Sequence, residues 1–249
     1  IQRTFEKSMA ENLRNSYEDL LESYSNQTLF LARYITLKGL PKQRAAFLRD
    51  LQDQVALLSE RINNLQARSV SRDVDIALPL QTQARKAAHL ATLLTCIDSV
   101  SAHKGLLAHE EEVALKEICE ARLSPLHEML AHSILALFYL IKNDVERFSP
   151  EVEEHAGLVV NNSGYQIGLA HNVLAVNQFL LAEESFQEGR LVKALSAAHT
   201  NFQGLLMAAS VDGTPEASFR AHNNCAWGMA RVLRWHVKQP LPRKITPAD

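Results

Sequence analysis

Residues 164–210 read GYQIGLAHNVLAVNQFLLAEESFQEGRLVKALSAAHTNFQGLLMAAS, and they decide the fold that we predict for this chain. Apolar residues recur at helical spacing on both sides of the short polar segment 187–190, which contains a glycine. The stretch therefore predicts two helices joined by one tight turn, each with a wide apolar face. We expect the other helices of the chain to pack around this hairpin.

Helical spacing continues along most of the chain on both sides of the hairpin. Glycine, which weakens helices, occurs only 9 times in 249 residues. Local signals mark several helix ends: Gly39 and Pro41 close the first helix, and Ser149 followed by Pro150 opens another. The predicted class is all-α, an irregular helical bundle or a short α-solenoid. The predicted helices cover residues 2–38, 42–68, 80–104, 110–142 with a break at Pro125, a segment from 150, the two halves of 164–210, and 216–238.

The sequence predicts two parts and a tail. Residues 1–70 are expected to form a long N-terminal αα-hairpin, because each half carries an apolar stripe and the second stripe is close to a coiled-coil heptad pattern. Residues 71–239 are expected to form a helical bundle, with 130–141 in its core, and residues 240–249, with three prolines, an extended tail. The two stripes of the hairpin are Phe5, Met9, Leu13, Tyr17, Leu20, Tyr24 and Leu31, then Phe47, Leu51, Val55, Leu58, Ile62 and Leu65.

Composition argues against several classes of function. Charged residues make up 22% of the chain and the formal net charge is −2, whereas proteins that bind nucleic acid usually have a basic excess. No apolar run is long enough to insert into a membrane within this fragment. The three cysteines, Cys96, Cys119 and Cys225, do not form a disulfide pattern, so we expect a reducing compartment such as the cytoplasm. Because the chain begins at Ile1, we expect a fragment or a processed form.

Part of the organising hairpin matches a repeat pattern. Counted from Ala175, small and apolar residues stand where the tetratricopeptide repeat, a 34-residue helix–turn–helix, has them, so residues 175–238 resemble that family. A second unit starting at Phe219 places Cys225 and Ala226 at the corresponding step. The matching positions of the first unit are Leu181, Ala182, Gly189 and Ala194, and the departures are Gln178, Ser185 and Asn201.

The resemblance implies a surface that binds a partner's peptide, lined by the first helix of each unit. It places Arg220, Asn223, Asn224 and Trp227 towards the ligand, and Arg and Asn side chains suit a peptide backbone or a carboxylate. The alternative is that the two asparagines cap a helix or face solvent and that Trp227 belongs to the core.

Metal and catalytic motifs are weak. His222 and Cys225, with His199 and His236, could converge on a zinc ion, and the His-x-x-Cys spacing resembles that of a bacterial zinc-sensing helical domain, but the distal paired histidines of that family are missing. The paired Glu-x-x-His motifs of diiron bundles, glycine-rich phosphate loops and nucleophile elbows are also missing. We therefore expect no metal, no cofactor and no enzymatic activity.

These observations favour a non-enzymatic helical module that binds another protein or a peptide, as an adaptor, regulator or effector does. The alternative is a helical sensor domain of a bacterial signalling receptor, which would bind a small ligand between its helices.

Overall fold

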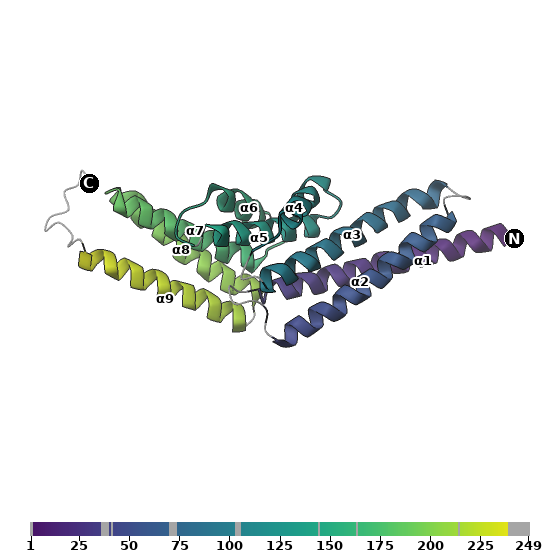
Figure 1. The fold of residues 1–249 in the computed structure, drawn as a ribbon, viewed down its shortest axis with the longest axis horizontal. Helices are drawn as coiled ribbons and strands as arrows, with labels where there is room; N and C mark the ends of the chain where they lie inside the picture. The colour runs from purple at the N-terminus through teal and green to yellow at the C-terminus, as the bar shows by residue number, and fades with distance from the viewer. Residues whose placement is uncertain are drawn as a thin grey trace. The chain divides into compact units, whose positions relative to one another are not determined.

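The structure is a computed structural model that describes residues 2–35, 40, 42–69, 74–102, 106–143, 145–162, 164–213 and 215–238. These residues form nine helices and no strand (Figure 1), so the predicted all-α class is confirmed. The tail predicted for residues 240–249 lies outside the described residues. The helices are α1 (Gln2–Ala32), α2 (Lys42–Ser69), α3 (Val74–Ala102), α4 (His109–Ala121), α5 (Pro125–Lys142), α6 (Pro150–Val160), α7 (Gly168–Gln187), α8 (Leu191–Asp212) and α9 (Pro215–Lys238).

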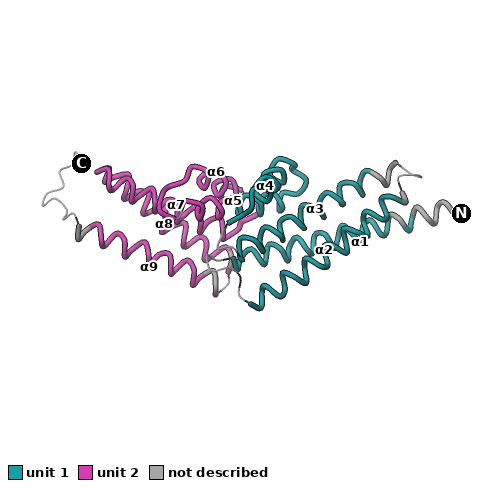
Figure 2. The backbone as a smooth tube through the Cα atoms, viewed as in Figure 1, with its two compact units in different colours: residues 1–134 teal, residues 135–249 magenta. Residues whose placement is uncertain are grey.

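The chain divides into two compact units, residues 1–134 (unit 1) and residues 135–249 (unit 2), as Figure 2 shows. The change between the two units falls within α5. The sequence suggested a change of character at residues 69–79 instead, but that segment includes the end of α2 and the start of α3, which pack against each other inside unit 1. The predicted buried segment at 130–141 is confirmed, because every residue from Met129 to Leu140 is buried.

Unit 1 is built on three long helices, with α3 in contact with both α1 and α2. The predicted seam of α2 is confirmed, since Leu51, Val55 and Ile62 are fully buried and Leu58 is nearly so. The short helix α4 packs against α3. The acidic first turn of α4 stabilises the start of the helix. The Glu111 carboxylate accepts hydrogen bonds from the Ala108 amide, at 2.8 Å, and from a hydroxyl on α3.

The stripe predicted for α1 is confirmed only in part. Leu31 is fully buried and Tyr17 and Tyr24 are partly buried, while the side chain of Phe5 lies outside the described residues. Met9, Leu13 and Leu20 were expected on the packed side and are exposed, with 55% of Met9 accessible. The buried side of α1 includes Ser25 and Thr28, which an apolar pattern does not reveal. Both hydroxyls donate to carbonyls four residues earlier in the helix, at 2.6 and 2.8 Å, and this pairing allows the two polar side chains to be buried.

Two predicted helix ends were wrong. The first helix ends at Ala32, not at 38, because its last turn tightens: the amides of Arg33 and Tyr34 bond to carbonyls three residues back. The third helix begins at Val74, not at 80, and includes Pro79. A proline in the second turn removes only one bond of the helical ladder, so this helix can start before it.

In unit 2, α7 is the central helix and contacts α6, α8 and α9. Thirteen of its twenty residues are buried, on every side of the helix, as expected for a helix that neighbours surround. The hairpin predicted for residues 164–210 is α7 and α8, and its turn is confirmed: Gly189 has φ +76°, a conformation that glycine adopts without strain. The predicted start after Ser149 is also confirmed, since its hydroxyl accepts from the Val152 amide.

The helices α7 and α8 approach closely where Gly204 faces Ala175. A Cβ atom added at Gly204 would lie 3.0 Å from the Ala175 Cβ, a contact tighter than nine in ten Cβ contacts in proteins. Small buried residues continue this contact along the pair, with Ala182 packed against Ala197 and Ala198. The small residues of the organising stretch therefore set the spacing of the two helices.

One polar residue in the core of unit 1 has an unusual environment. The His127 Nε2 lies 2.8 Å from the Ser25 Oγ, and that hydroxyl already donates to the Leu21 carbonyl, so the imidazole must be the donor. The His127 Nδ1 has no partner among the described residues, and the side chain is only 2% exposed. Burial, together with the smaller effect of the positive charges of His89 and Lys86, lowers the pKa of His127 to about 4.

We predict that Gly204→Leu lowers the free energy of unfolding by about 1–3 kcal/mol, because the larger side chain forces α7 and α8 apart. The matched control is Gly157→Ala in α6, where an added Cβ meets nothing within 4 Å and stability should rise by up to about 1 kcal/mol. Urea unfolding followed by circular dichroism measures both. Equal effects of the two changes would show that the close approach at Gly204 is not a packing constraint.

We predict that His127 makes unit 1 less stable in acid. The unfolded chain takes up a proton at this residue near pH 6.5, while the folded chain resists protonation down to about pH 4. The free energy of unfolding should therefore fall between those pH values by about 3 kcal/mol from this residue alone. Urea unfolding at several pH values should show a weaker acid dependence in His127→Gln than in the wild type, and the same dependence in both would contradict the assignment.

Candidate interaction surface

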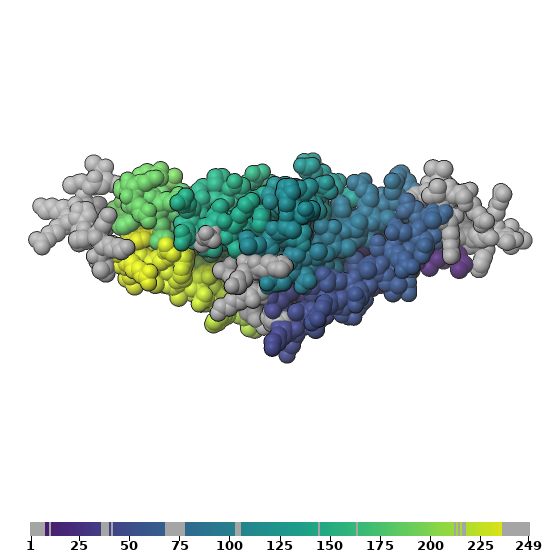
Figure 3. All heavy atoms as spheres, in the orientation of Figure 1, coloured from purple at the N-terminus to yellow at the C-terminus, as the bar shows by residue number. Residues whose placement is uncertain are grey.

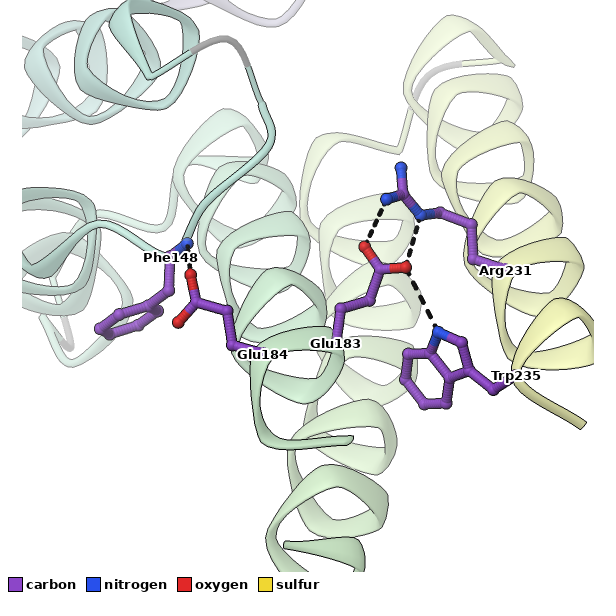
Figure 4. Close-up of polar contacts among 5 residues, drawn as sticks. All are labelled: Phe148, Glu183, Glu184, Arg231 and Trp235. Atoms are coloured by element: carbon purple, nitrogen blue, oxygen red, sulfur yellow. Dashed lines mark hydrogen bonds and ion pairs between the residues drawn. The ribbon is translucent and has the colours of Figure 1, made fainter. Parts of the chain in front are cut away.

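Polar side chains on the buried helix α7 hold the start of α6. The Asn177 Oδ1 accepts from the Ser149 amide and its Nδ2 donates to the Ser149 carbonyl, both at 2.9 Å. The neighbouring Phe148 amide donates to the Glu184 Oε1 at 3.0 Å (Figure 4). These three bonds fix the backbone immediately before α6 and leave both Asn177 and that backbone satisfied.

The helices α8 and α9 are also held to α7 by side-chain amides. The Asn201 Nδ2, from α8, donates to the Ala175 carbonyl at 2.6 Å. The Asn224 Nδ2, from α9, donates to the Asn172 Oδ1 at 2.9 Å. Each bond ties one outer helix to α7 at a buried or partly buried position, where an amide without a partner would be costly.

A carboxylate on α7 makes the strongest polar contact with α9 (Figure 4). The Arg231 Nε donates to the Glu183 Oε1 at 2.8 Å, and the Arg231 Nη2 lies 2.5 Å from the Glu183 Oε2. This is the two-pronged geometry in which arginine binds a carboxylate best. The Trp235 Nε1 adds a longer bond, 3.3 Å, to the Glu183 Oε1. We call Glu183, Arg231 and Trp235 the α7–α9 clamp.

Aromatic rings surround the α7–α9 clamp. Trp235 stacks on Phe186 and on Phe179, with ring centroids 4.7 and 5.6 Å apart, and Trp227 meets Phe179 edge-on at 5.1 Å. The Arg231 guanidinium lies 4.8 Å from the centroid of the Trp227 ring. The clamp is therefore shielded by apolar surface, which strengthens its charged hydrogen bonds relative to those of an open surface pair.

The structure separates the four residues that the sequence proposed as partner contacts. Trp227 and Asn224 face α7, through the ring contact and the amide bond described above. Arg220 is partly exposed on α9, and Asn223 is exposed on its outer side. The structure thus brings Asn223 to an accessible position, buries the Nε and Nη1 atoms of Arg220, and gives Asn224 and Trp227 contacts within unit 2.

Apolar side chains also lie on the outer sides of α8 and α9, which sequence reasoning did not identify as a site. The most exposed large ones are Phe219 at 75% and Leu206 at 68%. Figure 3 shows atoms of α9 (yellow) at the surface beside those of α8 (green). The nine residues of this outer surface are Val192, Leu195, Leu206 and Met207 on α8, and Phe219, Ala226, Met229, Ala230 and Leu233 on α9.

The residues considered as metal ligands do not converge in the described part of the chain. The His222 Nδ1 lies 2.6 Å from the Ser218 carbonyl, Cys225 packs against a buried cluster, and His199 is exposed. No group of three or more His, Cys, Asp or Glu among the described residues could hold a metal ion. Burial raises the pKa of Cys96 and of Cys119 to about 12, so both remain neutral thiols.

Unit 1 carries an open depression along α1. Its lining residues lie on that one helix and include Asp19, Glu22 and Phe30. Binding sites for small molecules are usually enclosed by several elements and mostly apolar. The depression does not have this form, so it gives no support to a small-ligand site.

Comparisons with protein-family models, with curated proteins and with solved structures found no match to this chain. The resemblance of residues 175–238 to tetratricopeptide repeats therefore stays a prediction. None of the helices in the described ranges has both the length and the apolar character needed to cross a membrane.

We predict that Glu183 and Arg231 stabilise unit 2 jointly. Glu183→Gln and Arg231→Met should each lower the free energy of unfolding by about 1–3 kcal/mol, and the double variant should cost less than the sum. Both tryptophans of the chain lie on α9, so tryptophan fluorescence reports the α9 side of the unit. As a control, Lys116→Ala removes an exposed ion pair within α4 and should cost under about 0.5 kcal/mol. Additive effects of the two changes would contradict a coupled clamp.

Proposed function

We propose that this chain is a non-enzymatic helical module that binds another protein, and that it binds through the outer surface of α8 and α9. The observation that carries the proposal is the set of exposed apolar residues at helical spacing on these two helices. Single exposed apolar residues are common, but nine on two neighbouring helices are typical of an interaction site.

The inner sides of the two helices support the same proposal. Asn201 holds α8 and the α7–α9 clamp holds α9, so both helices are fixed to a buried support. A surface on fixed helices loses little conformational freedom when a partner binds, and this favours affinity. The resemblance of residues 175–238 to tetratricopeptide repeats agrees with a binding role. It implies a surface lined by the first helix of each unit, α7 and α9, whereas the surface proposed here lies on α8 and α9.

Asn223 is the sequence-proposed residue that fits this surface. It is exposed next to the apolar residues of α9, whereas the Nε and Nη1 atoms of Arg220 are buried. In this proposal Asn223 provides a polar contact at the edge of the interface, while Trp227 and Asn224 position α9. Polar edges around an apolar centre are the usual composition of protein interfaces.

We predict that a photo-crosslinking amino acid at Leu206 and at Leu233 captures the same protein from extracts of the source cells. The control position is Leu158, which is 50% exposed on α6 and outside the outer surface. The double variant Leu206→Glu, Leu233→Glu should lose this capture without a change in stability larger than about 0.5 kcal/mol, because both side chains are exposed. Different captured proteins at the two positions, or the same protein at Leu158, would refute the proposed surface.

A further inference from the structure

The exposed apolar residues of α9 have the geometry of one side of a helix–helix seam. At about 100° per residue, Phe219, Ala226, Met229, Ala230 and Leu233 fall within an arc of roughly 100°. Their spacings of seven, three, one and three residues match the positions at which paired helices contact each other. From Phe219 to Leu233 the row is about 21 Å long, or roughly four helical turns. A single amphipathic helix of similar length fits this row.

The charge of α9 favours one kind of helix. Its sequence has four basic residues and one acidic residue, a formal charge of +3 in a chain of formal charge −2. Among the α9 residues whose side chains are described, Arg220, Arg231 and Arg234 are charged and none is acidic, but Arg231 is paired with Glu183 and the Nε and Nη1 atoms of Arg220 are buried. The charge that α9 presents to a partner among these residues is therefore Arg234. Arg234 is exposed beside the apolar row. An acidic partner complements this charge, whereas a basic partner is repelled.

Two other occupants fit less well. A second copy of α9 has no acidic residue among those whose side chains are described, so it offers Arg234 no carboxylate, and like charges at a helix seam disfavour pairing. An anionic membrane surface is usually bound by clusters of about four to eight Lys and Arg side chains. The exposed basic residues described on α8 and α9 are Lys193 and Arg234, with Arg220 partly exposed.

We propose that the partner of this chain contributes an amphipathic α-helix with acidic flanks, which lies along the exposed apolar row of α9. The inference rests on the proposed function and specifies the chemistry of the partner. The apolar face of that helix covers Phe219, Met229 and Leu233, and its carboxylates approach Arg234.

The test uses the full chain and two fluorescein-labelled synthetic peptides of about 18 residues. Both peptides have leucine at the heptad contact positions, with glutamate on the flanks of one and lysine on the flanks of the other. In fluorescence anisotropy the glutamate peptide should bind at least about tenfold more tightly, and raising the salt concentration should reduce this preference.

Variants separate the contribution of charge to peptide binding from the contribution of the apolar row. Arg234→Glu should reduce or reverse the preference for the glutamate peptide, and Leu233→Glu should abolish binding of both peptides. Leu158→Glu on α6 is the control and should change neither. Circular dichroism of each variant establishes that it is folded, and the salt dependence of the wild type tests the charge contribution without any substitution.

Equal binding of the two peptides, a preference for the lysine peptide, or no binding of either would overturn the inference. Two other results would also overturn it: self-association of the chain in analytical ultracentrifugation, or binding of the chain to phosphatidylserine vesicles, if Leu233→Glu abolishes that association or binding. If the flanking charge of the peptides has no effect on binding while the Leu206→Glu, Leu233→Glu variant still loses the partner that crosslinks to the wild type, only this inference fails. If that partner is also absent, the proposed function fails as well.

Discussion

Unit 2 depends on the pairing of polar groups on a helix that is otherwise buried among apolar side chains. The polar side chains of α7 include Asn172, Asn177, Glu183 and Glu184, and each bonds to a neighbouring element. An unpaired amide or carboxylate in such a place costs several kcal/mol, so alternative arrangements that break these bonds are disfavoured. Apolar packing holds the helices together, while the polar pairs select which residues face each other.

The same polar and apolar contacts explain the binding surface that we propose, because they involve only the inner side of α9. The polar and aromatic residues on the inner side of α9, including Arg231 and Trp235, are engaged with α7. The outer side keeps apolar residues that the fold of unit 2 does not use, such as Phe219 and Leu233. A helix with its inner side fixed and its outer side apolar is suited to receive a second helix. In our proposal, the charge on α9 then favours an acidic helix.

The features that could be predicted from the sequence are those that depend on interactions between residues close together in the chain. The start at Ser149, the turn at Gly189 and the seam of α2 follow from capping, backbone conformation and period, which involve near neighbours in the chain. The stripe of α1 was wrong at Met9, Leu13 and Leu20, and its buried side includes Ser25 and Thr28 because their hydroxyls bond within their own helix. The α7–α9 clamp joins residues 48 and 52 positions apart, so spacing could not reveal it. Its only signal was a pair of adjacent glutamates, Glu183 and Glu184, in an apolar helix.

Hydrogen exchange of backbone amides in the full chain tests the central role of α7 most directly, because exchange rates report local stability along the chain. If α7 is the support to which the other helices of unit 2 are fixed, its amides from Asn172 to Glu184 exchange more slowly than those of α6, α8 and α9. Faster exchange in α7 than in α9 would show that α9 stays folded without this support, and would contradict the account.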